Sequence, residues 1–160
     1  MKPFLKPVAG GFTLIEMVAV VAIVAALAGM AVPVVSLVKQ RTQELELRHA
    51  LRTLRAALDE HKRAADAKEI ELPFGSSGYP LTLKSLVDGV VDPRTPERKL
   101  RYFLRRLPRD PFAGPDTPPD GWGLRSYASP HDAPQAGADV YDVYSTSQRQ
   151  AIDGTYYKDW

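Results

Sequence analysis

The feature that most constrains this chain is an uncharged run from Met17 to Val38 near its N-terminus. At about 1.5 Å per residue, an α-helix of this length spans roughly 33 Å, enough to cross the hydrocarbon core of a bilayer. Lys2 and Lys6 precede the run, and no acidic residue occurs before Glu16. Because basic residues tend to stay on the cytoplasmic side, we expect a single-pass helix with a cytoplasmic N-terminus and an exported C-terminal part.

Glu16 is the unusual residue at the start of this run. A carboxylate at membrane depth costs about 2.5 kcal/mol or more, so Glu16 requires a partner or a function. An ordinary secretory signal, with small residues near a cut at 28–31, is one alternative for this region, and an ordinary single-span anchor is another. Neither alternative explains the sequence Gly-Phe-Thr-Leu-Ile-Glu at residues 11–16.

Residues 11–16 resemble the N-terminal signature of the type IV pilin superfamily, which covers type IV pilins, type II secretion pseudopilins and competence pseudopilins. The resemblance implies that a prepilin peptidase cuts between Gly11 and Phe12 and methylates the new amine of Phe12. Glu16 is then the fifth mature residue, where the family glutamate is thought to meet the N-terminal amine of a neighbouring subunit. Pro33 is the twenty-second, where the family commonly has a proline, and we expect it to kink the helix.

A second helical pattern continues from the apolar run, from Lys39 to about Lys68. Leucines recur there at steps of four, three and four, which is one stripe of a helix. The stripe consists of Leu47, Leu51, Leu54 and Leu58, broadened by Ala50, Ala57 and Ala65. On the polar face, Glu44 with Arg48 and Asp59 with Arg63 have the i,i+4 spacing of supporting ion pairs. The pattern predicts one long helix from about Phe12 to Lys68, with the leucine stripe packed against a sheet.

The composition changes at Pro73, because most of the 14 prolines lie between Pro73 and Pro134. Long regular elements are therefore not expected in this region. Short apolar and alternating patterns predict the remaining elements. They are a short helix within 81–91 with Thr82 as its possible N-cap, another short helix or turn at 99–107, and strands at 123–128 and 140–145.

This C-terminal part also resembles the body of the major pseudopilin of type II secretion. The similar residues are Tyr79-Pro80 with Ser85-Leu86-Val87, the run Leu104-Arg105-Arg106-Leu107-Pro108-Arg109-Asp110-Pro111, Trp122 and Tyr127, and Asp142-Val143-Tyr144-Ser145. The resemblance implies a calcium ion in the C-terminal loop. The loop at 145–154 contains one acid, Asp153, with Arg149 nearby, whereas calcium prefers six to eight oxygen ligands. The candidate ligands are Asp153, Asp139, Ser145 and Ser147, with Asp142 and Asp159 also within reach, and the alternative is a loop without metal, closed by turns and aromatic packing.

The histidines and one basic segment are candidates for two other kinds of site. His49 and His61 lie on different faces of the long helix and His131 lies in a proline-rich loop, so no catalytic or metal-binding spacing emerges and surface positions are expected for all three. The segment from Arg94 to Arg109 holds seven basic residues against Glu97 alone. Three alternatives remain for this segment: contact with DNA, contact with an acidic subunit, or a solvated face that pairs with Asp110, Asp116 or the acidic residues of the long helix. Without Lys2 and Lys6 the chain has 19 basic and 19 acidic side chains, which disfavours nucleic acid.

Together these observations predict an α+β, pilin-like fold: a long N-terminal helix, its first half transmembrane, packed on a small C-terminal antiparallel sheet with short helices and loops. The expected division is a leader at 1–11, a transmembrane and assembly helix at 12–38, and a periplasmic domain at 39–160. The expected function is structural and non-enzymatic, as a subunit of a type II secretion pseudopilus in the inner membrane and periplasm, with no cofactor unless calcium binds. Expected partners are copies of the chain, other pseudopilins, the prepilin peptidase and the inner-membrane assembly platform. The alternatives are a type IV pilin or minor pilin, or a DNA-binding competence pseudopilin.

Overall fold

The computed structural model describes residues 11–160, apart from the side chains of residues 30–33. The chain divides into two units, with the boundary along the sequence between Lys39 and Gln40, and α1 contributes to both. In chain order, the elements are α1 (Leu14–Asp66), α2 (Ser85–Asp88), β1 (Val90–Val91), β2 (Leu100–Arg101), β3 (Gly123–Arg125), β4 (Asp142–Tyr144) and a 3₁₀ helix, η1 (Tyr157–Asp159). The fold is α+β, as predicted, and is consistent with a pilin-like architecture. The division into leader, anchor and exported domain concerns processing and a membrane, and it stays a prediction.

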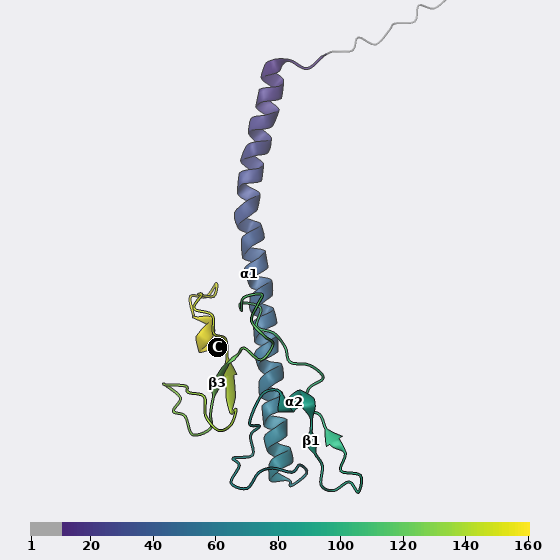
Figure 1. Cartoon of the computed structure of the whole chain (residues 1–160). Coiled ribbons are helices and arrows are strands. Elements are labelled where there is room, and N and C mark those ends of the chain that lie inside the picture. Colours follow the sequence, from purple (N-terminus) through teal and green to yellow (C-terminus); the bar gives the residue numbers. More distant parts are fainter. Residues whose placement is uncertain (1–10) are drawn as a thin grey trace, which may run out of the picture. The chain divides into compact units, whose positions relative to one another are not determined.

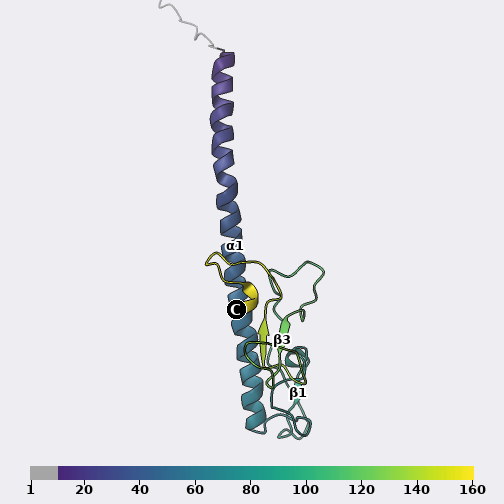
Figure 2. The same cartoon turned by 90° about the vertical axis from the view of Figure 1, so that its left-hand side faces the viewer.

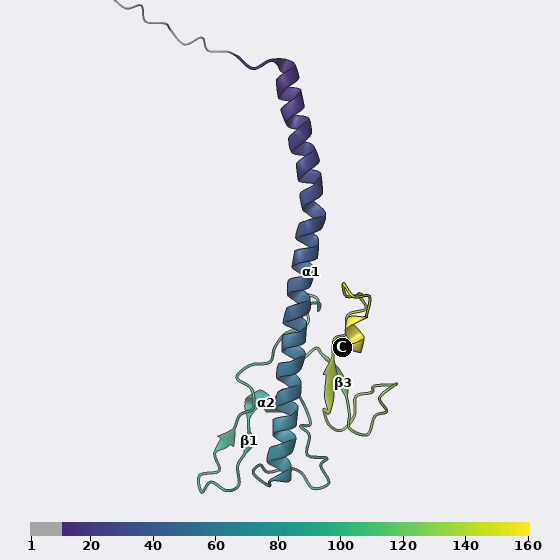
Figure 3. The same ribbon diagram turned by 180° about the vertical axis from the view of Figure 1, so that it is seen from behind.

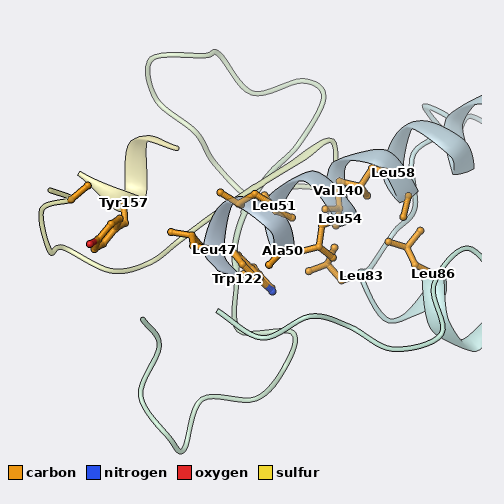
Figure 4. Close-up of a cluster of buried hydrophobic side chains, with 13 residues drawn as sticks. Leu47, Ala50, Leu51, Leu54, Leu58, Leu83, Leu86, Trp122, Val140 and Tyr157 are labelled. Carbon is orange, nitrogen blue, oxygen red and sulfur yellow. The ribbon is translucent and has the colours of Figure 1, made fainter. Parts of the chain in front are cut away.

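The predicted leucine stripe on the second half of α1 forms the core of the second unit. Leu47, Leu54 and Leu58 are 0% exposed and Leu51 is 3% exposed. Figure 4 shows them gathered with side chains from the rest of the unit, including Leu83, Leu86, Trp122, Val140 and Tyr157. Full burial of one such leucine is worth about 1.5–3 kcal/mol, so the stripe is a main source of this unit's stability. The predicted packing of the helix against the strands is confirmed, with Val143 of β4 also in the core. Ala64 is buried, whereas the predicted Ala65 is only partly so.

The end of α1 comes two residues earlier than the sequence pattern suggested. The backbone N–H of Glu69 donates to Ala64 O at 2.8 Å, and that of Lys68 donates to Ala65 O at 3.0 Å. This pair of bonds is a Schellman motif, which needs a residue with positive φ just beyond the helix, and Lys68 has φ 54°. Lys68 therefore terminates α1 and is not its last helical residue.

Two small antiparallel sheets take the place of the single sheet that was expected. In the first, β1 pairs with β2, with Val90 opposite Arg101. In the second, β3 pairs with β4, with Leu124 opposite Val143. The strands at 123–128 and 140–145 are predicted in the right places but are shorter than expected. β3 ends at Arg125 because the N–H of the next residue, Ser126, donates to Gln135 O at 2.9 Å and not to β4.

The predictions of short helices at 81–91 and 99–107 need correction. The helix α2 occupies only Ser85–Asp88, and its end is set by Gly89, whose φ is 87°. The residues after Gly89 form β1, and the segment predicted as a second helix contains β2. The N-cap position of α2 is Lys84, which makes no capping bond with its side chain. Thr82 instead accepts a hydrogen bond on its Oγ1 from the N–H of Ser85 at 3.4 Å, as in a turn.

Within the second unit, the elements cover one side of α1 and leave the other side open. Figures 1 and 3 show α2 and β1 along one flank of the helix and β3 with the C-terminal segment along the other. Figure 2 shows that both groups lie on the same side of the helix. The opposite side carries the exposed residues Leu45, His49, Arg52 and Ala56. The second half of α1 is therefore amphipathic in the structure as well as in the sequence.

Candidate functional site

The N-terminal motif forms the first turn of α1, and two of its residues cap the helix. The backbone N–H of Glu16 donates to Thr13 Oγ1 at 3.3 Å, and the backbone N–H of Thr13 donates to the Glu16 carboxylate at 3.4 Å. This reciprocal pair is a capping box, in which a Thr before the helix and a Glu three residues later satisfy each other's free N–H groups. The negative charge of Glu16 also lies at the positive end of the helix dipole. Glu16 therefore caps its own helix, and this role is separate from the predicted contact with a neighbouring subunit.

The capping box was visible in the sequence and was missed there. Thr13-Leu14-Ile15-Glu16 has the spacing of a Ser or Thr followed three residues later by Glu, directly before an apolar run. The proposed cleavage position lies immediately ahead of it. Both Gly11 and Phe12 are exposed, and the Phe12 side chain is 74% exposed. A peptidase therefore meets no steric obstacle from the rest of the described chain at this bond.

The part of α1 that belongs to the first unit exposes its apolar side chains in every direction. Every residue from 14 to 29 and from 34 to 39 is exposed, including Leu14, Ile23 and Leu37. Among the described residues, α1 is the one helix long and apolar enough to cross a membrane. A helix that is apolar all round needs lipid or other apolar helices as its surroundings. Pro33 lies within α1, but its side chain is outside the described part, so the kink stays a prediction.

Glu44, at the start of the second unit, is the main polar residue that sequence reasoning assigned wrongly. It is 8% exposed and does not pair with Arg48. Its Oε1 accepts hydrogen bonds from Tyr157 OH at 2.9 Å, from the N–H of Ile152 at 2.8 Å and from Gln40 Nε2 at 3.3 Å. Burial and the bond to Gln40 act on Tyr157 in opposite directions, and burial prevails, so the pKa of the Tyr157 phenol is raised. The buried carboxylate thus fastens the C-terminal segment to α1.

Two arginines of α1 complete this attachment. Arg55 donates from Nε to Asp142 Oδ1 at 2.8 Å and from Nη2 to the carbonyl oxygens of Val143 and Trp160 at 3.1 and 2.6 Å. The Arg48 guanidinium lies 4.3 Å from the centre of a Trp160 ring. The predicted pair of Asp59 with Arg63 is also absent, since Arg63 pairs with Glu60 at 2.8 Å. The charged residues of α1 therefore hold distant segments more than they support the helix itself.

The four candidate calcium ligands fall into three hydrogen-bond groups, and only Ser145 and Ser147 share one, through a bond from the N–H of Ser147 to Ser145 Oγ at 3.1 Å. Asp139 is buried and accepts bonds from the hydroxyls of Ser77 and Ser126 and from the N–H of Tyr127. Burial raises the pKa of Asp139, but these three bonds outweigh it and hold the pKa below its usual value. Ser145 is fully buried and donates its hydroxyl to Asp110 Oδ2 at 2.6 Å.

The other two candidates are exposed to different degrees and have local partners. Asp153 accepts from the hydroxyl and N–H of Thr155 at 2.6 and 3.0 Å, and it lies 3.5 Å from Arg48. Bonds from Thr155, assisted by the charge of Arg48, lower the pKa of Asp153. Ser147 accepts from the N–H of Arg149 at 3.4 Å. In the part of the chain that the structure describes, no three Asp, Glu, His or Cys residues gather as a metal-holding group.

His61 corrects the expectation that all three histidines are surface residues. His49 and His131 are exposed, but His61 is 1% exposed. Its Nδ1 lies 2.9 Å from Gly78 O, to which it donates, and its ring packs on Phe103 with 5.0 Å between centroids. Burial lowers the pKa of His61, and the bond to Gly78 opposes this only in part. The residue is a neutral structural histidine that fixes the loop after α1.

Part of the basic segment is neutralised by carboxylates of the same unit. Arg94 lowers the pKa of Asp92 to about 2 through a side-chain hydrogen bond. The ion pairs are Arg94 with Asp92 and Glu69, Arg98 with Glu71, Lys99 with Glu97, and Arg101 with Glu60 and Glu69. Among these carboxylates, Glu60 is the acidic residue of the long helix that pairs with the basic segment. Four of the seven basic residues therefore serve this unit's own structure.

A capped apolar helix that continues into a small α+β unit fits a membrane-anchored, pilin-like protein. In agreement with this, the family model of the prokaryotic N-terminal methylation motif matches residues 7–32. This prepilin-type motif implies processing by a prepilin peptidase and assembly with other pilin-like subunits. No curated protein and no solved structure matches the chain. The match covers the motif and not the body, so the resemblance of the body to major pseudopilins stays a prediction.

Proposed function

We propose that this protein is a structural subunit of a type II secretion pseudopilus, which helps to drive folded proteins across the outer membrane. The family model supports the more general part of this proposal, namely a pilin-like protein with a methylation motif. The assignment to secretion draws on the resemblance of residues 79–111, 122–127 and 142–145 to the major pseudopilin body. In this role the chain carries out no catalysis, and its work is done by assembly and disassembly.

The main support for the proposal is the difference in exposure between the two parts of α1. Residues 14–29 and 34–39 expose an apolar surface that finds no cover in the described chain, whereas the second unit buries its own core. In a membrane, lipid covers the exposed helix, and in a filament the helices of neighbouring subunits replace the lipid. Transfer between these two apolar surroundings does not require the helix to enter water. A subunit of this design is therefore stored in the membrane and recruited to a growing filament.

Glu16 adds specificity to this assembly step. After cleavage, the amine of Phe12 carries a positive charge near the apolar core of the filament. An ion pair with Glu16 of an adjacent subunit removes the cost that each charge alone would impose. The capping box holds the carboxylate at the first turn of the helix, four residues after Phe12. We infer that the carboxylate exchanges its local bond to Thr13 for the amine during assembly.

The alternatives are a type IV pilin or minor pilin, and a DNA-binding competence subunit. The absence of cysteine from the sequence tilts the choice toward a pseudopilin, because a disulfide near the C-terminus is frequent in pilins. The neutralisation of Arg94, Arg98 and Arg101 leaves a shorter basic surface than the sequence suggested. This weakens the hypothesis of a DNA-binding competence subunit.

Gene deletion in the native host, followed by complementation with the parent chain, tests the proposal. We expect loss of extracellular release of secreted proteins, with their accumulation in the periplasm. The control readouts are surface pili by electron microscopy, and transformation frequency. Loss of pili with normal secretion would instead identify a pilin, and loss of transformation alone would identify a competence subunit.

A further inference from the structure

The last three basic residues of the segment 94–109 differ from the first four because no carboxylate neutralises them. Among the described residues, Arg105, Arg106 and Arg109 take part in no ion pair, and all three are exposed. Arg109 is held in place by its Nη2, which donates to the carbonyl oxygens of Pro115 and Thr117 at 3.1 and 2.6 Å. These bonds orient the guanidinium without removing its charge. The three arginines therefore form a positively charged surface whose charge is free for another molecule.

These arginines border an open depression of about 610 Å³. Lys84 contributes a fourth basic side chain, and the one acidic side chain in the lining is Asp88, 3.8 Å from Lys84 Nζ. The remaining lining is apolar and comes from Val87, Leu107, Pro108 and Pro119. The depression thus combines a basic rim with an apolar surface, and its volume exceeds that of a single small anion.

Hydrogen bonds on both sides hold the walls of the depression. Leu86 of α2 is fully buried, and its carbonyl oxygen accepts from the N–H groups of Phe103 and Leu104 at 3.0 and 2.9 Å. On the other side, Trp122 donates from Nε1 to Pro108 O at 3.1 Å. These bonds fix the course of the chain that carries the arginines. The backbone that forms the depression is therefore part of the folded unit, and it holds the positions from which the basic side chains extend.

We propose that this depression binds an acidic peptide segment of a different protein, with an apolar side chain of that segment on the apolar lining. Arginine guanidinium groups bind carboxylates in paired, charge-assisted hydrogen bonds, which are stronger than bonds between neutral groups. Four basic side chains against one acidic side chain favour a partner with several carboxylates. The apolar lining favours a peptide over a simple anion. This inference does not depend on filament assembly, because every residue it uses lies in the second unit.

The chain's own free carboxylates are poorly placed to fill the depression of a second copy. Asp116 and Asp120 belong to the loop that contributes Pro119, so they flank the depression itself. Asp132 and Asp159 line a separate cavity, but the basic side chains of Arg55, Arg125 and Lys158 line it too. That cavity is balanced in charge and is not acidic. Neither of these two pairs of carboxylates therefore offers a concentrated acidic surface of the kind the depression would select.

Nucleic acid is also a weaker fit. Binding to a phosphate backbone uses basic side chains along an extended path. Here the basic path is interrupted, because Arg94, Arg98 and Arg101 are paired with carboxylates. The free charge is confined to one depression, which suits a short segment better than a long polyanion.

Fluorescence anisotropy with the full chain in an uncharged detergent tests the proposal. The probe is a short labelled peptide of glutamates around a central Leu-Phe pair, and its counterpart has glutamine in place of glutamate. The test variant is Arg105→Glu with Arg106→Glu. The matched control is Arg41→Glu with Arg52→Glu, which changes the net charge equally at two exposed positions of α1. A single-stranded oligonucleotide and the self-association of the chain are measured alongside.

We expect the parent chain to bind the glutamate peptide and to bind the glutamine peptide more weakly. The Arg105 and Arg106 variant should weaken binding about tenfold or more, whereas the control should change it by less than about twofold. Equal weakening in both variants, equal binding of both peptides or no binding by the parent would overturn the proposal. Tighter binding of the oligonucleotide would identify a nucleic-acid site, and self-association lost only in the test variant would identify an interface between copies.

Discussion

The two halves of α1 have the same secondary structure but different surroundings. In the first half, Leu27 is 62% exposed and Val24 is 58% exposed, whereas in the second half Leu47 and Leu54 are completely buried. Helix geometry alone does not produce this difference. The second half carries polar residues on one side, so a single face of loops and strands suffices to cover its leucines. The first half is apolar on every side, and cover must come from a membrane or from other subunits.

The two glutamates at the starts of these halves show the same contrast. Glu44 is buried and accepts three hydrogen bonds from its own unit. Glu16 is exposed and has one weak local bond, from the N–H of Thr13 at 3.4 Å. Glu16 therefore has more bonding capacity left than Glu44, and its exposure leaves the carboxylate accessible to a further donor. The carboxylate of Glu16 is therefore open to a donor from outside the described chain, whereas that of Glu44 is enclosed by its own unit.

The largest effect is expected at the processing site. Gly11→Leu should abolish cleavage, because a bulky side chain hinders the close approach of the peptidase to this bond, and Gly11→Ala should process poorly. Mass spectrometry of the parent chain should find a methylated Phe12 as its first residue. The second unit should fold normally in the uncleaved variant. A parent N-terminus near Ala31 would identify an ordinary secretory signal and remove the basis for contrasting the two halves.

A pair of leucine variants tests the contrast in burial directly. Leu54→Ala should destabilise the second unit by about 2–5 kcal/mol, because it leaves a cavity in the core. Leu27→Ala, the matched change in the first half, should alter the unfolding of the second unit by less than about 0.5 kcal/mol. Thermal unfolding of the full chain in detergent measures both, with Leu45→Ala as an exposed control on the second half. Equal effects of Leu54 and Leu27 would contradict the division into two units.

Two substitutions at Glu16 separate its capping role from its charge. Glu16→Gln retains a capping side chain but removes the charge, whereas Glu16→Ala removes both. If the carboxylate pairs with the amine of a neighbouring subunit, both variants should be cleaved and inserted normally but should assemble poorly. Cross-linking of subunits in cells measures assembly. Normal assembly of Glu16→Gln alone would assign the residue to helix capping and refute the ion pair.

The sequence predicted the fold where local patterns decide it. The leucine stripe from Leu47 to Leu58 identified the buried face of α1 because its spacing belongs only to a helix. The segment 99–107 was predicted as a helix or turn, whereas Leu100 and Arg101 pair with β1 across 9 and 11 positions, beyond the span of one periodic pattern. In the same way, the ties of Glu44 to Tyr157 and of Arg55 to Asp142 join residues 113 and 87 positions apart. No local spacing identifies such contacts.

The N-terminal motif could be recognised from the sequence in the same way, because Gly11, Phe12 and Glu16 belong to one contiguous run, 11–16, which the family model covers. Their roles in processing and assembly stay predictions. The capping by Thr13 is equally local, because it joins residues only three positions apart. The burial of His61 was not predictable from its helical position, since Gly78 and Phe103, which cover it, come from two later loops.

His61 provides a smaller effect that depends on pH. Burial keeps its pKa below the ordinary value of 6.5, so the folded state binds the proton less readily than the unfolded state. Its contribution to stability is fully present above the unfolded pKa and is lost as pH falls through the folded pKa. The free energy of unfolding should therefore decrease below about pH 6.5 in the parent chain. His61→Gln should flatten this decrease, whereas His49→Gln, at an exposed position, should leave it intact. A parallel decrease in both variants would rule out His61 as the cause.

The smallest effect is expected for removal of calcium. If calcium bound only the folded chain, a hundredfold excess over Kd would add about 2.7 kcal/mol of stability and raise the midpoint by several degrees. We expect no change on adding a chelator, since Asp153 is neutralised by Arg48, while Asp139 is already occupied by Ser77, Ser126 and Tyr127. Arg149, which the sequence placed beside Asp153, instead lies over the Phe112 ring at 5.2 Å.

Two variants distinguish a metal site from ordinary hydrogen bonding in this loop. Asp139→Ala should lower the thermal midpoint to the same extent with and without chelator, because it leaves the donors of two loops unpaired in a buried place. Asp153→Ala, at an exposed turn, should have little effect in either condition. A chelator-sensitive midpoint that Asp153→Ala abolishes would establish a calcium site. It would also show that the second unit, like the first half of α1, depends on something outside the chain for its stability.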